Sequence, residues 1–376
     1  MGQAGDEIAL HQLHTPHGTL ALPAFLPDAT RGVVRTVDAA DLRACGVSAV
    51  VTSTYHLMGS PGVGAIHAAG GLHRFMGWDG PLVTDSGGFQ VFSLIRENPG
   101  LGSLTRDGAV FRAEAGGRRR LLTPEKSIQA QFQLGADILF CFDDCTRAEE
   151  AAAEQSASVE RTISWARRCR AAFDQLLDQR GQLGADAAAR PRLFGIIQGG
   201  DDPLLRRRCA EALVAMGFDG YGLGGWPVDG RGRLLAETLQ CTADLMPAGP
   251  KFALGVGKPE NLIACARMGY NLFDCTLPTR DARHHRLYVF HSADPASVLE
   301  DGFYEHFYAL DDVYVRDGRP VSAHCGCACC RSYSRAYLRH LFAVGDPLAL
   351  RLATLHNLTF YEDLVGRIRT LAVGAR

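Results

Sequence analysis

The stretch TPEKSIQAQFQLGADILFCFDD, residues 123–144, contains a helix signal followed directly by a strand signal. It opens on Thr-Pro-Glu, an N-cap with proline at the first helical position, and the helical pattern closes on Gly135. The apolar run that follows predicts a buried strand, which ends on the carboxylates Asp143 and Asp144. A helix, a strand and polar residues at the carboxyl end of that strand are one unit of a parallel α/β fold.

The same unit recurs along the chain. DDPLLRRRCAEALVAMGFDG, residues 201–220, repeats the helix design with an aspartate cap, a first-turn proline and a closing glycine. The alternation predicts an α/β protein built as a parallel (β/α)8 TIM barrel, with an open doubly wound sheet as the alternative, because periodicity does not show closure. The eight predicted strands lie at 20–27, 48–53, 81–86, 136–144, 192–200, 220–225, 251–257 and 272–278.

Composition limits the class of protein. The 376 residues are 47% hydrophobic and 21% charged, which is typical of a globular chain. No apolar run is long enough to cross a bilayer and the first residues do not resemble a secretory signal, so we expect a cytoplasmic protein without a membrane partner. The net charge of −2 gives no overall basic signature for nucleic acid, although a local arginine patch is sufficient for binding.

Carboxylates follow several of the predicted strands. Asp85 ends the strand in VTDSGGFQ and Asp274 ends the strand in FDCTLPTR, in addition to the pair at 143–144. Taken singly, each aspartate can be a helix cap or a turn residue. In a barrel, however, the carboxyl ends of the strands form the active-site face, where one carboxylate can act as nucleophile and another as acid or base. Chemistry at a sugar anomeric carbon uses such a pair, and the pattern therefore predicts an enzyme.

Four cysteines lie within HCGCACC, which ends at Cys330. The adjacent Cys329 and Cys330 do not easily bind one ion together, so the spacing favours Cys327 and Cys330 as a C-x-x-C pair, with free thiols as the alternative. Cys325 supplies a third ligand and His356, in a helical pattern, supplies a fourth. Four protein ligands leave no open position for water, so we predict a structural Zn²⁺ site.

The chain resembles the tRNA-guanine transglycosylases of bacterial type, the queuosine-forming tRNA ribosyltransferases, along nearly all its length. The resemblance implies an irregular TIM barrel with a zinc-binding insertion near its C-terminus, divided as a catalytic domain at 1–290 and, at 291–376, a zinc-binding subdomain with C-terminal helices that complete the barrel. The motifs that carry it are, in order, STYHL, GGLHRFMGWDGPLVTDSGGFQVFSL, FDDCT, FGIIQGG, GFDGYGLGG, GVGKPEN, FDCTLPTR and CGCACCRSYSRAYLRHL, with LHNL downstream.

The resemblance also implies an activity. Members of the family exchange the wobble guanine of certain tRNAs for a 7-deazaguanine, such as prequeuosine base or queuine. By resemblance, Asp274 is the nucleophile that forms a covalent glycosyl–aspartate, and Asp85 is the general acid/base. The partners implied are tRNA, the incoming base and a second copy of the chain in a homodimer. The binding residues implied are Asp143, Gln198, Gly225, Phe89 and Trp226 for the base, and Arg280 and Arg283 for the tRNA.

Several residues depart from the family pattern. TSTYHL has Ser53 in place of an asparagine, PDAT stands in place of Pro-Val-Gly-Thr, and PTRDAR has Asp281 where an uncharged residue is common. In GGWPVDG, Trp226 replaces a leucine whose carbonyl touches the 7-substituent of the base, and Gly230 replaces a glutamate, with an aspartate one position earlier. We therefore expect glycosyl exchange to be preserved while the preference for the incoming base changes.

Two rival hypotheses remain. The same exchange can act on another nucleic acid, on a nucleoside, or with a different 7-deazaguanine. An accessory subunit that binds without catalysis is the second rival, and the presence of both Asp274 and Asp85 argues against it.

Overall fold

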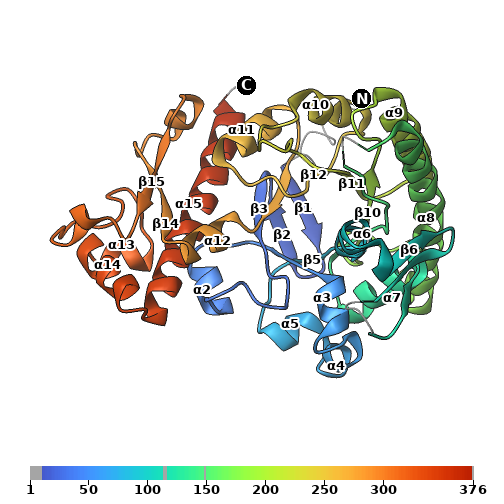
Figure 1. Ribbon diagram of the computed structural model, residues 1–376, viewed down its shortest axis with the longest axis horizontal. Helices are drawn as coiled ribbons and strands as arrows, with labels where there is room; N and C mark the ends of the chain where they lie inside the picture. The colour runs from blue at the N-terminus through green and yellow to red at the C-terminus, as the bar shows by residue number, and fades with distance from the viewer. Residues whose placement is uncertain (1–10, 113–116, 148–149, 375–376) are drawn as a thin grey trace.

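The computed structural model of the protein describes residues 11–112, 117–147 and 150–374 (Figure 1). Its central sheet has eight parallel strands, and a parallel bridge between Asp28 and Val51 joins the two end strands into a barrel. The predicted barrel is confirmed and the open sheet is wrong. Around the barrel the strands are β3 (Ala24–Pro27), β13 (Leu272–Cys275), β12 (Lys251–Ala253), β11 (Gly220–Leu223), β10 (Arg192–Ile197), β9 (Ile138–Phe140), β5 (Leu82–Thr84) and β4 (Val50–Thr52).

The first predicted strand differs from the expectation. Residues of the run 20–27 belong to two strands, because β2 (Gly18–Ala21) pairs antiparallel with β1 (Gln12–Thr15) and only β3 enters the barrel. Pro23 lies between β2 and β3 and has no N–H to donate to a ladder, which explains the break.

The inside of the barrel is filled by side chains. Phe140 packs edge-on against Phe194 and Phe252, with ring centroids 5.7 Å and 5.3 Å away, and all three rings are buried. This packing makes the barrel a solid core rather than a channel, as in other barrels of this class. Polar chemistry is therefore confined to the ends of the strands.

Helices surround the barrel, as Figure 1 shows. Both predicted helices form with the expected caps, since the Thr123 side chain accepts from the backbone of Lys126 and the Asp202 side chain accepts from Leu204 and Leu205. No helix within the described ranges is both long and apolar enough to cross a membrane. The outer helices are α7 (Pro124–Leu134), α8 (Ala152–Gln179), α9 (Pro203–Met216), α10 (Ala236–Leu245), α11 (Pro259–Arg267) and α12 (Leu277–Arg283).

Two insertions interrupt the regular alternation, and their elements are too short for periodicity to reveal. One holds a three-stranded antiparallel sheet of β6 (Gly102–Thr105), β7 (Gly108–Phe111) and β8 (Arg120–Leu122) beside α6 (Gly88–Glu97). The early part of the chain forms the short helices α2 (Ala39–Ala44), α3 (Thr54–Gly59), α4 (Val63–Ala68) and α5 (Gly71–Met76).

The C-terminal part of the chain lies to one side of the barrel, at the left of Figure 1. It contains the antiparallel pair β14 (Arg286–Phe290) and β15 (Tyr304–Tyr308), then α13 (Ala328–Ser332), α14 (Arg335–Ala343) and α15 (Pro347–Gly374). Leu352 of α15 packs into the core of this part, whereas Leu358 and Tyr361 pack into the two cores of the barrel side. Helix α15 thus contributes side chains both to the barrel and to the C-terminal part.

Candidate active site and metal centre

Asp85 lies at the carboxyl end of β5, as predicted. Its Oδ1 accepts from the backbone N–H of Thr54 at 2.7 Å and of Gly87 at 3.0 Å, and its Oδ2 accepts from Gln90 Nε2 at 2.9 Å. Burial raises the pKa of Asp85 to about 6, although these hydrogen bonds act in the opposite direction. A carboxyl group with such a pKa exchanges protons near neutral pH.

Asp274 lies on β13 and accepts from the backbone N–H of Gly255 at 3.0 Å. Burial raises its pKa to about 7, and the charges of Asp28 and Asp85 raise it further in that direction. Asp85 and Asp274 both lie at the carboxyl ends of parallel strands, so the closed barrel brings them to the same end. Asp28, from the unusual PDAT motif, was not among the predicted site residues, and its place directly after a barrel strand was the signal that could have revealed it.

Asp143 and Asp144 point in different directions from the end of β9. Asp143 binds Gln198, whose Nε2 donates to Oδ2 at 2.7 Å, and burial raises the pKa of Asp143 to about 7. Asp144 instead forms ion pairs with Arg96 at 3.2 Å and Arg161 at 2.7 Å. Of the two neighbours, Asp143 is therefore the one free to contact a ligand, because arginines already satisfy Asp144.

Gln198 is completely buried and holds an open acceptor. Its Oε1 atom meets no hydrogen-bond donor among the residues that the structure describes. Buried polar atoms are nearly always paired, so this atom favours a ligand donor at this point. The adjoining backbone is tightly packed, since a Cβ added at Gly224 would lie 2.5 Å from Gln198 Cδ, and Gly225 has a φ of +94° that favours glycine.

Two exposed aromatic rings meet at the rim of this face. Phe89 and Trp226 are 44% and 43% exposed, and their ring centroids lie 5.4 Å apart with an interplanar angle of 60°. Phe89 follows Asp85 in the chain by four residues and Trp226 directly follows Gly225. The pair therefore lies where the segments that carry Asp85 and the Gln198-packed glycines come together.

The aspartate of GGWPVDG is already engaged. Asp229 Oδ1 accepts from the backbone N–H of Arg231 and of Arg233, each at 2.9 Å, and its Oδ2 accepts from Arg233 Nε at 2.8 Å. These contacts fold the turn back on itself and satisfy both carboxylate oxygens. Asp229 therefore does not substitute for the acid missing at Gly230, where a Cβ would meet no atom within 4 Å.

Helix α12 places the two predicted arginines near a third. Arg280 is exposed, and Arg283 Nη1 donates to the carbonyl of Thr279 at 2.9 Å. Burial lowers the pKa of Arg283, and the charges of Arg35 and Arg280 lower it further. Arg35 was missed at the sequence level because it lies far from Arg280 and Arg283 in the chain and comes near them only through the fold.

The four predicted metal ligands come together. The Sγ atoms of Cys325, Cys327 and Cys330 and a ring nitrogen of His356 all lie within 4.8 Å of one another. His356 Nδ1 lies 3.2 Å from Cys330 Sγ, while its Nε2 lies 2.7 Å from the carbonyl oxygen of Tyr288. Three soft thiol ligands and one imidazole, oriented by a hydrogen bond from its other nitrogen, suit Zn²⁺. Cys329, fully buried, is not a member of the cluster.

A second group of His17, His73 and Asp137 does not fit a metal ion. Its two imidazole rings stack with centroids 3.6 Å apart and an interplanar angle of 19°, so one ion cannot lie in both ring planes. His17 Nδ1 lies 2.7 Å from Asp137 Oδ1, and Asp137 Oδ2 accepts from the backbone N–H of Leu82 at 2.8 Å. The group is a hydrogen-bond cluster that fastens the β1–β2 hairpin to the barrel.

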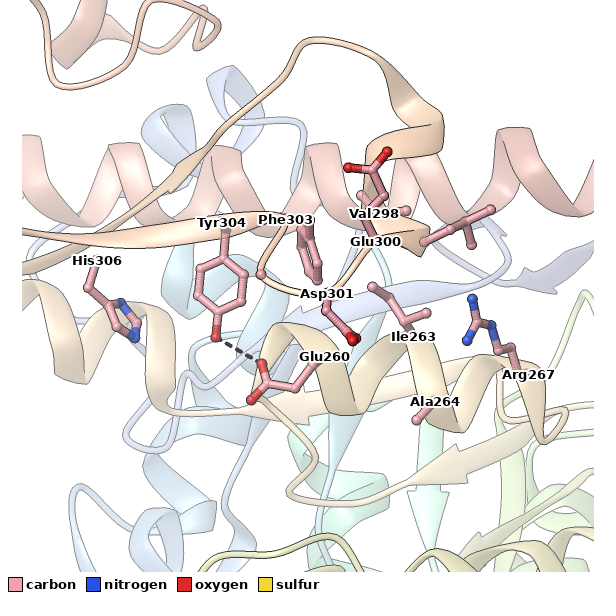
Figure 2. A pocket seen from close by; sticks show the side chains of 12 residues that line it. Glu260, Ile263, Ala264, Arg267, Val298, Glu300, Asp301, Phe303, Tyr304 and His306 are labelled. Atoms are coloured by element: carbon pink, nitrogen blue, oxygen red, sulfur yellow. Dashed lines mark hydrogen bonds between the residues drawn. The ribbon is translucent and has the colours of Figure 1, made fainter.

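A surface cavity of about 470 Å³ lies between α11 and the segment that leads into β15 (Figure 2). Glu260 accepts a hydrogen bond there from the Tyr304 hydroxyl at 2.8 Å, and Glu300 and Asp301 lie on its border. The residues that line this cavity include no member of the predicted site. The cavity is therefore separate from the carboxylate cluster.

Comparison with known proteins agrees with the geometry. A family model described as queuine tRNA-ribosyltransferase matches residues 7–372. The queuine tRNA-ribosyltransferase of Novosphingobium aromaticivorans is 39% identical over 360 residues, covering 96% of this chain and 90% of the relative. Those of Desulforamulus reducens and Lysinibacillus sphaericus are 40% and 38% identical, covering 96% and 98% of this chain and 90% and 88% of each relative.

The raised pKa of Asp274 predicts a pH-dependent effect of Asp274→Asn on stability. A carboxyl group whose pKa rises from 3.8 to about 7 on folding stabilises the fold below its unfolded pKa, and this contribution is lost as pH rises through 7. The variant does not titrate, so we expect it to be more stable than the wild type at pH 8 by about 1–3 kcal/mol, after allowance for solvent screening. The difference should shrink toward pH 4.

Urea unfolding at several pH values measures this difference. Asp312→Asn is a matched control, because the Asp312 side chain is 93% exposed and should change stability little at any pH. A stability difference for Asp274→Asn that stayed constant from pH 4 to pH 8 would contradict the prediction.

The geometry of the cysteines predicts that substitution of Cys330 and of its neighbour Cys329 affects metal binding differently. Cys330→Ser should lose the bound metal and destabilise the protein, because it removes one of four ligands. Cys329→Ser should keep one metal ion per chain, since Cys329 lies outside the cluster. Metal analysis of the purified variants, with thermal unfolding, tests this, and metal loss from Cys329→Ser alone would overturn the ligand assignment.

Proposed function

This chain belongs to the queuine tRNA-ribosyltransferase family, and on that basis we propose that it exchanges the wobble guanine of tRNA for a 7-deazaguanine. The observation that carries the proposal is that two half-buried carboxyl groups, Asp85 and Asp274, lie at the end of the barrel that also carries the Asp143–Gln198 pair. Such a cluster offers a nucleophile, a proton carrier and a polar base-binding edge at one end of a barrel.

In this proposal Asp274 attacks C1′ of the wobble nucleoside. Its carboxylate oxygen forms a bond to C1′ while the C1′–N9 bond breaks and its electron pair leaves with guanine. The N–H of Gly255 on Oδ1 orients the carboxylate, so Oδ2 is the attacking oxygen. Asp85 donates a proton to the departing base and accepts one from the incoming base, which then attacks the same carbon. Two displacements retain the anomeric configuration.

The base-binding edge follows from the chemistry of guanine. Asp143 accepts from the N1–H and 2-amino donors, and the backbone N–H of Gly225 donates to the 6-carbonyl. Gln198 orients Asp143 through Nε2 and offers its open Oε1 as a further acceptor. Phe89 and Trp226 flank the base, which must leave the anticodon stack before it can enter. Arg280 and Arg283 hold the single-stranded loop by stacking and hydrogen bonds.

We assign the metal to Cys325, Cys327, Cys330 and His356, and propose that it is Zn²⁺. When bound, the ion supplies a structural cross-link between α13 and α15 and no reactive group, because all four ligands come from the protein. The division at residue 290 and the homodimer are part of the same proposal. The hydrophobic cluster of the C-terminal part, which includes Phe307, begins before residue 290, since Ala282, Leu287 and Val289 also belong to it.

One alternative keeps the exchange and changes the incoming base. The observation that favours it is the rim of the pocket, where Trp226 is exposed, Gly230 brings no acid and Asp229 is engaged with its own turn. Such a rim offers no free carboxylate at these positions to a positively charged 7-substituent. The base inserted can therefore be a 7-deazaguanine other than the aminomethyl-bearing prequeuosine base, or the target can be another nucleic acid or nucleoside.

Loss of the nucleophile tests the main proposal. Asp274→Ala should reduce incorporation of labelled guanine into unmodified tRNA by about 10⁴-fold or more, because no covalent intermediate can form. tRNA binding should persist, and the covalent enzyme–RNA adduct that we expect for the wild type on a denaturing gel should be absent. Asp312→Ala, at an exposed position, is the control. Exchange that survived Asp274→Ala would refute the assignment, and a wild type that labels no tRNA would refute the function.

The rim of the pocket predicts that a carboxylate added at position 230 increases the preference for the aminomethyl-bearing base. Gly230→Glu should raise kcat/KM for the aminomethyl-bearing base relative to queuine by about tenfold, because a carboxylate beside a cation at a protein surface contributes on the order of 1 kcal/mol. A Cβ added at Gly230 meets no atom within 4 Å, so the backbone there can carry a side chain, and Gly318→Glu is an equally open control. Base binding can be followed by fluorescence, since Trp78 and Trp165 are buried and only Trp226 is exposed.

An unchanged ratio in Gly230→Glu would show that this position does not govern the choice of base. A similar gain in Gly318→Glu would show that the effect is not local to the rim.

A further inference from the structure

The helix that carries the two predicted tRNA-binding arginines is anchored by a buried acid between them. Asp281 of α12 is 3% exposed, whereas its neighbours Arg280 and Arg283 face outward or lie half-buried. The Asp281 carboxylate accepts from Arg286 Nη2 at 2.8 Å and from the Tyr288 hydroxyl, both on β14. The acid therefore fixes one side of α12 to the first strand of the C-terminal part.

Tyr288 is held in turn by two consecutive residues of α15. Its carbonyl oxygen lies 2.7 Å from Nε2 of His356, and its N–H donates to Asn357 Oδ1 at 3.2 Å. Asn357 Nδ2 also reaches α12 directly, donating to the carbonyl of Pro278 at 3.0 Å. His356 faces the thiols through its other nitrogen. A continuous path of hydrogen bonds thus runs from the metal ligand, through Tyr288, to the middle of α12.

The ion pair between buried Asp281 and partly exposed Arg286 contributes little net stability, because desolvation of the carboxylate offsets the attraction. It does fix geometry, since the carboxylate can be satisfied in one arrangement only. The position of α12 matters for the site at both ends: Asp274 lies just before it, and Arg283 lies at its C-terminus.

We propose that Asp281 is a positioning residue which, through Tyr288, holds Arg280 and Arg283 of α12 in register with the metal-bound helix α15 for contact with tRNA. The inference rests on the proposed function, because tRNA is the partner that those arginines bind. It adds a role for the metal centre: the cross-link at His356 sets the placement of the RNA-binding helix as well as the fold around the cysteines.

The test compares isosteric variants. Asp281→Asn should raise the KM and Kd for tRNA by about tenfold, because displaced arginines lose contacts that depend on sub-ångström placement, while kcat changes by less than about twofold. Tyr288→Phe removes only the hydroxyl and should give a smaller effect in the same direction. Both variants should retain one metal ion per chain, which separates misplacement of α12 from loss of the metal centre.

Matched controls come from the same chain. Asp317→Asn removes an acid paired with Arg319 and Arg335 in the C-terminal part, with no link to α12. Tyr270→Phe removes a buried hydroxyl bonded to the carbonyl of Leu239. Neither should change tRNA affinity. An effect of equal size in these controls would overturn the inference, because it would reflect general destabilisation.

A combined variant decides whether Asp281 acts through the arginines. In a background of Arg280→Ala with Arg283→Ala, adding Asp281→Asn should weaken tRNA binding no further, since the groups it positions are already gone. A full additional tenfold loss would overturn the inference, as would wild-type affinity in Asp281→Asn itself. A wild-type protein that neither binds tRNA nor exchanges guanine would instead refute the proposed function.

Discussion

Closure of the sheet between β3 and β4 is the constraint on which the site depends. The backbone N–H of Ala29 donates to Val51 at 2.7 Å and that of Ser53 donates to Thr30 at 3.2 Å across this seam. In the strand order, β13 is next to one end of the sheet and β5 is next to the other. An open sheet would hold Asp274 and Asp85 at opposite edges, and only closure brings them to a common mouth. The candidate active site therefore depends on the closed topology of the barrel as well as on its side chains.

The common mouth has an electrostatic consequence. Burial raises the pKa values of Asp85, Asp143 and Asp274, and the charge of Asp85 also raises the pKa of Asp274. Such a cluster opposes folding at neutral pH, because every ionised carboxyl is worse solvated than in the unfolded chain. The same unfavourable setting gives each group a pKa near the pH at which it would act. Stability and reactivity are therefore opposed at the same three residues.

Most of the fold followed from local sequence patterns, because apolar strands bounded by glycine and capped helices have strong signals. Each of the eight predicted runs contains a barrel strand, and the three cysteines and the histidine chosen from the sequence do form one cluster. Periodicity alone left the open sheet as an alternative to the predicted barrel, because closure depends on pairing between distant segments. The change of strand partner at Pro23 was missed for the same reason.

The details of the site were predictable only in part. The choice of Asp143 over Asp144 came from family resemblance, and the arginines that pair with Asp144 come from two different helices, α6 and α8. Local sequence patterns also give no sign of two side-chain contacts. Asp229 pairs with Arg233, and Asp281 is buried against Tyr288.

The sharing of α15 between the two parts of the molecule has a consequence for the order of folding. Arg351 of α15 pairs with Asp41, Thr354 contacts Thr36, and Arg369 donates to the carbonyl of Pro23 at 2.7 Å. Segments near the start of the chain therefore contact residues more than 300 positions later. Asp41 and Arg351, for example, are separated by 310 residues. Contacts of such long range slow folding. During translation the surfaces of the early segments that pack against α15 stay uncovered until that helix leaves the ribosome, a period in which chaperones can protect them.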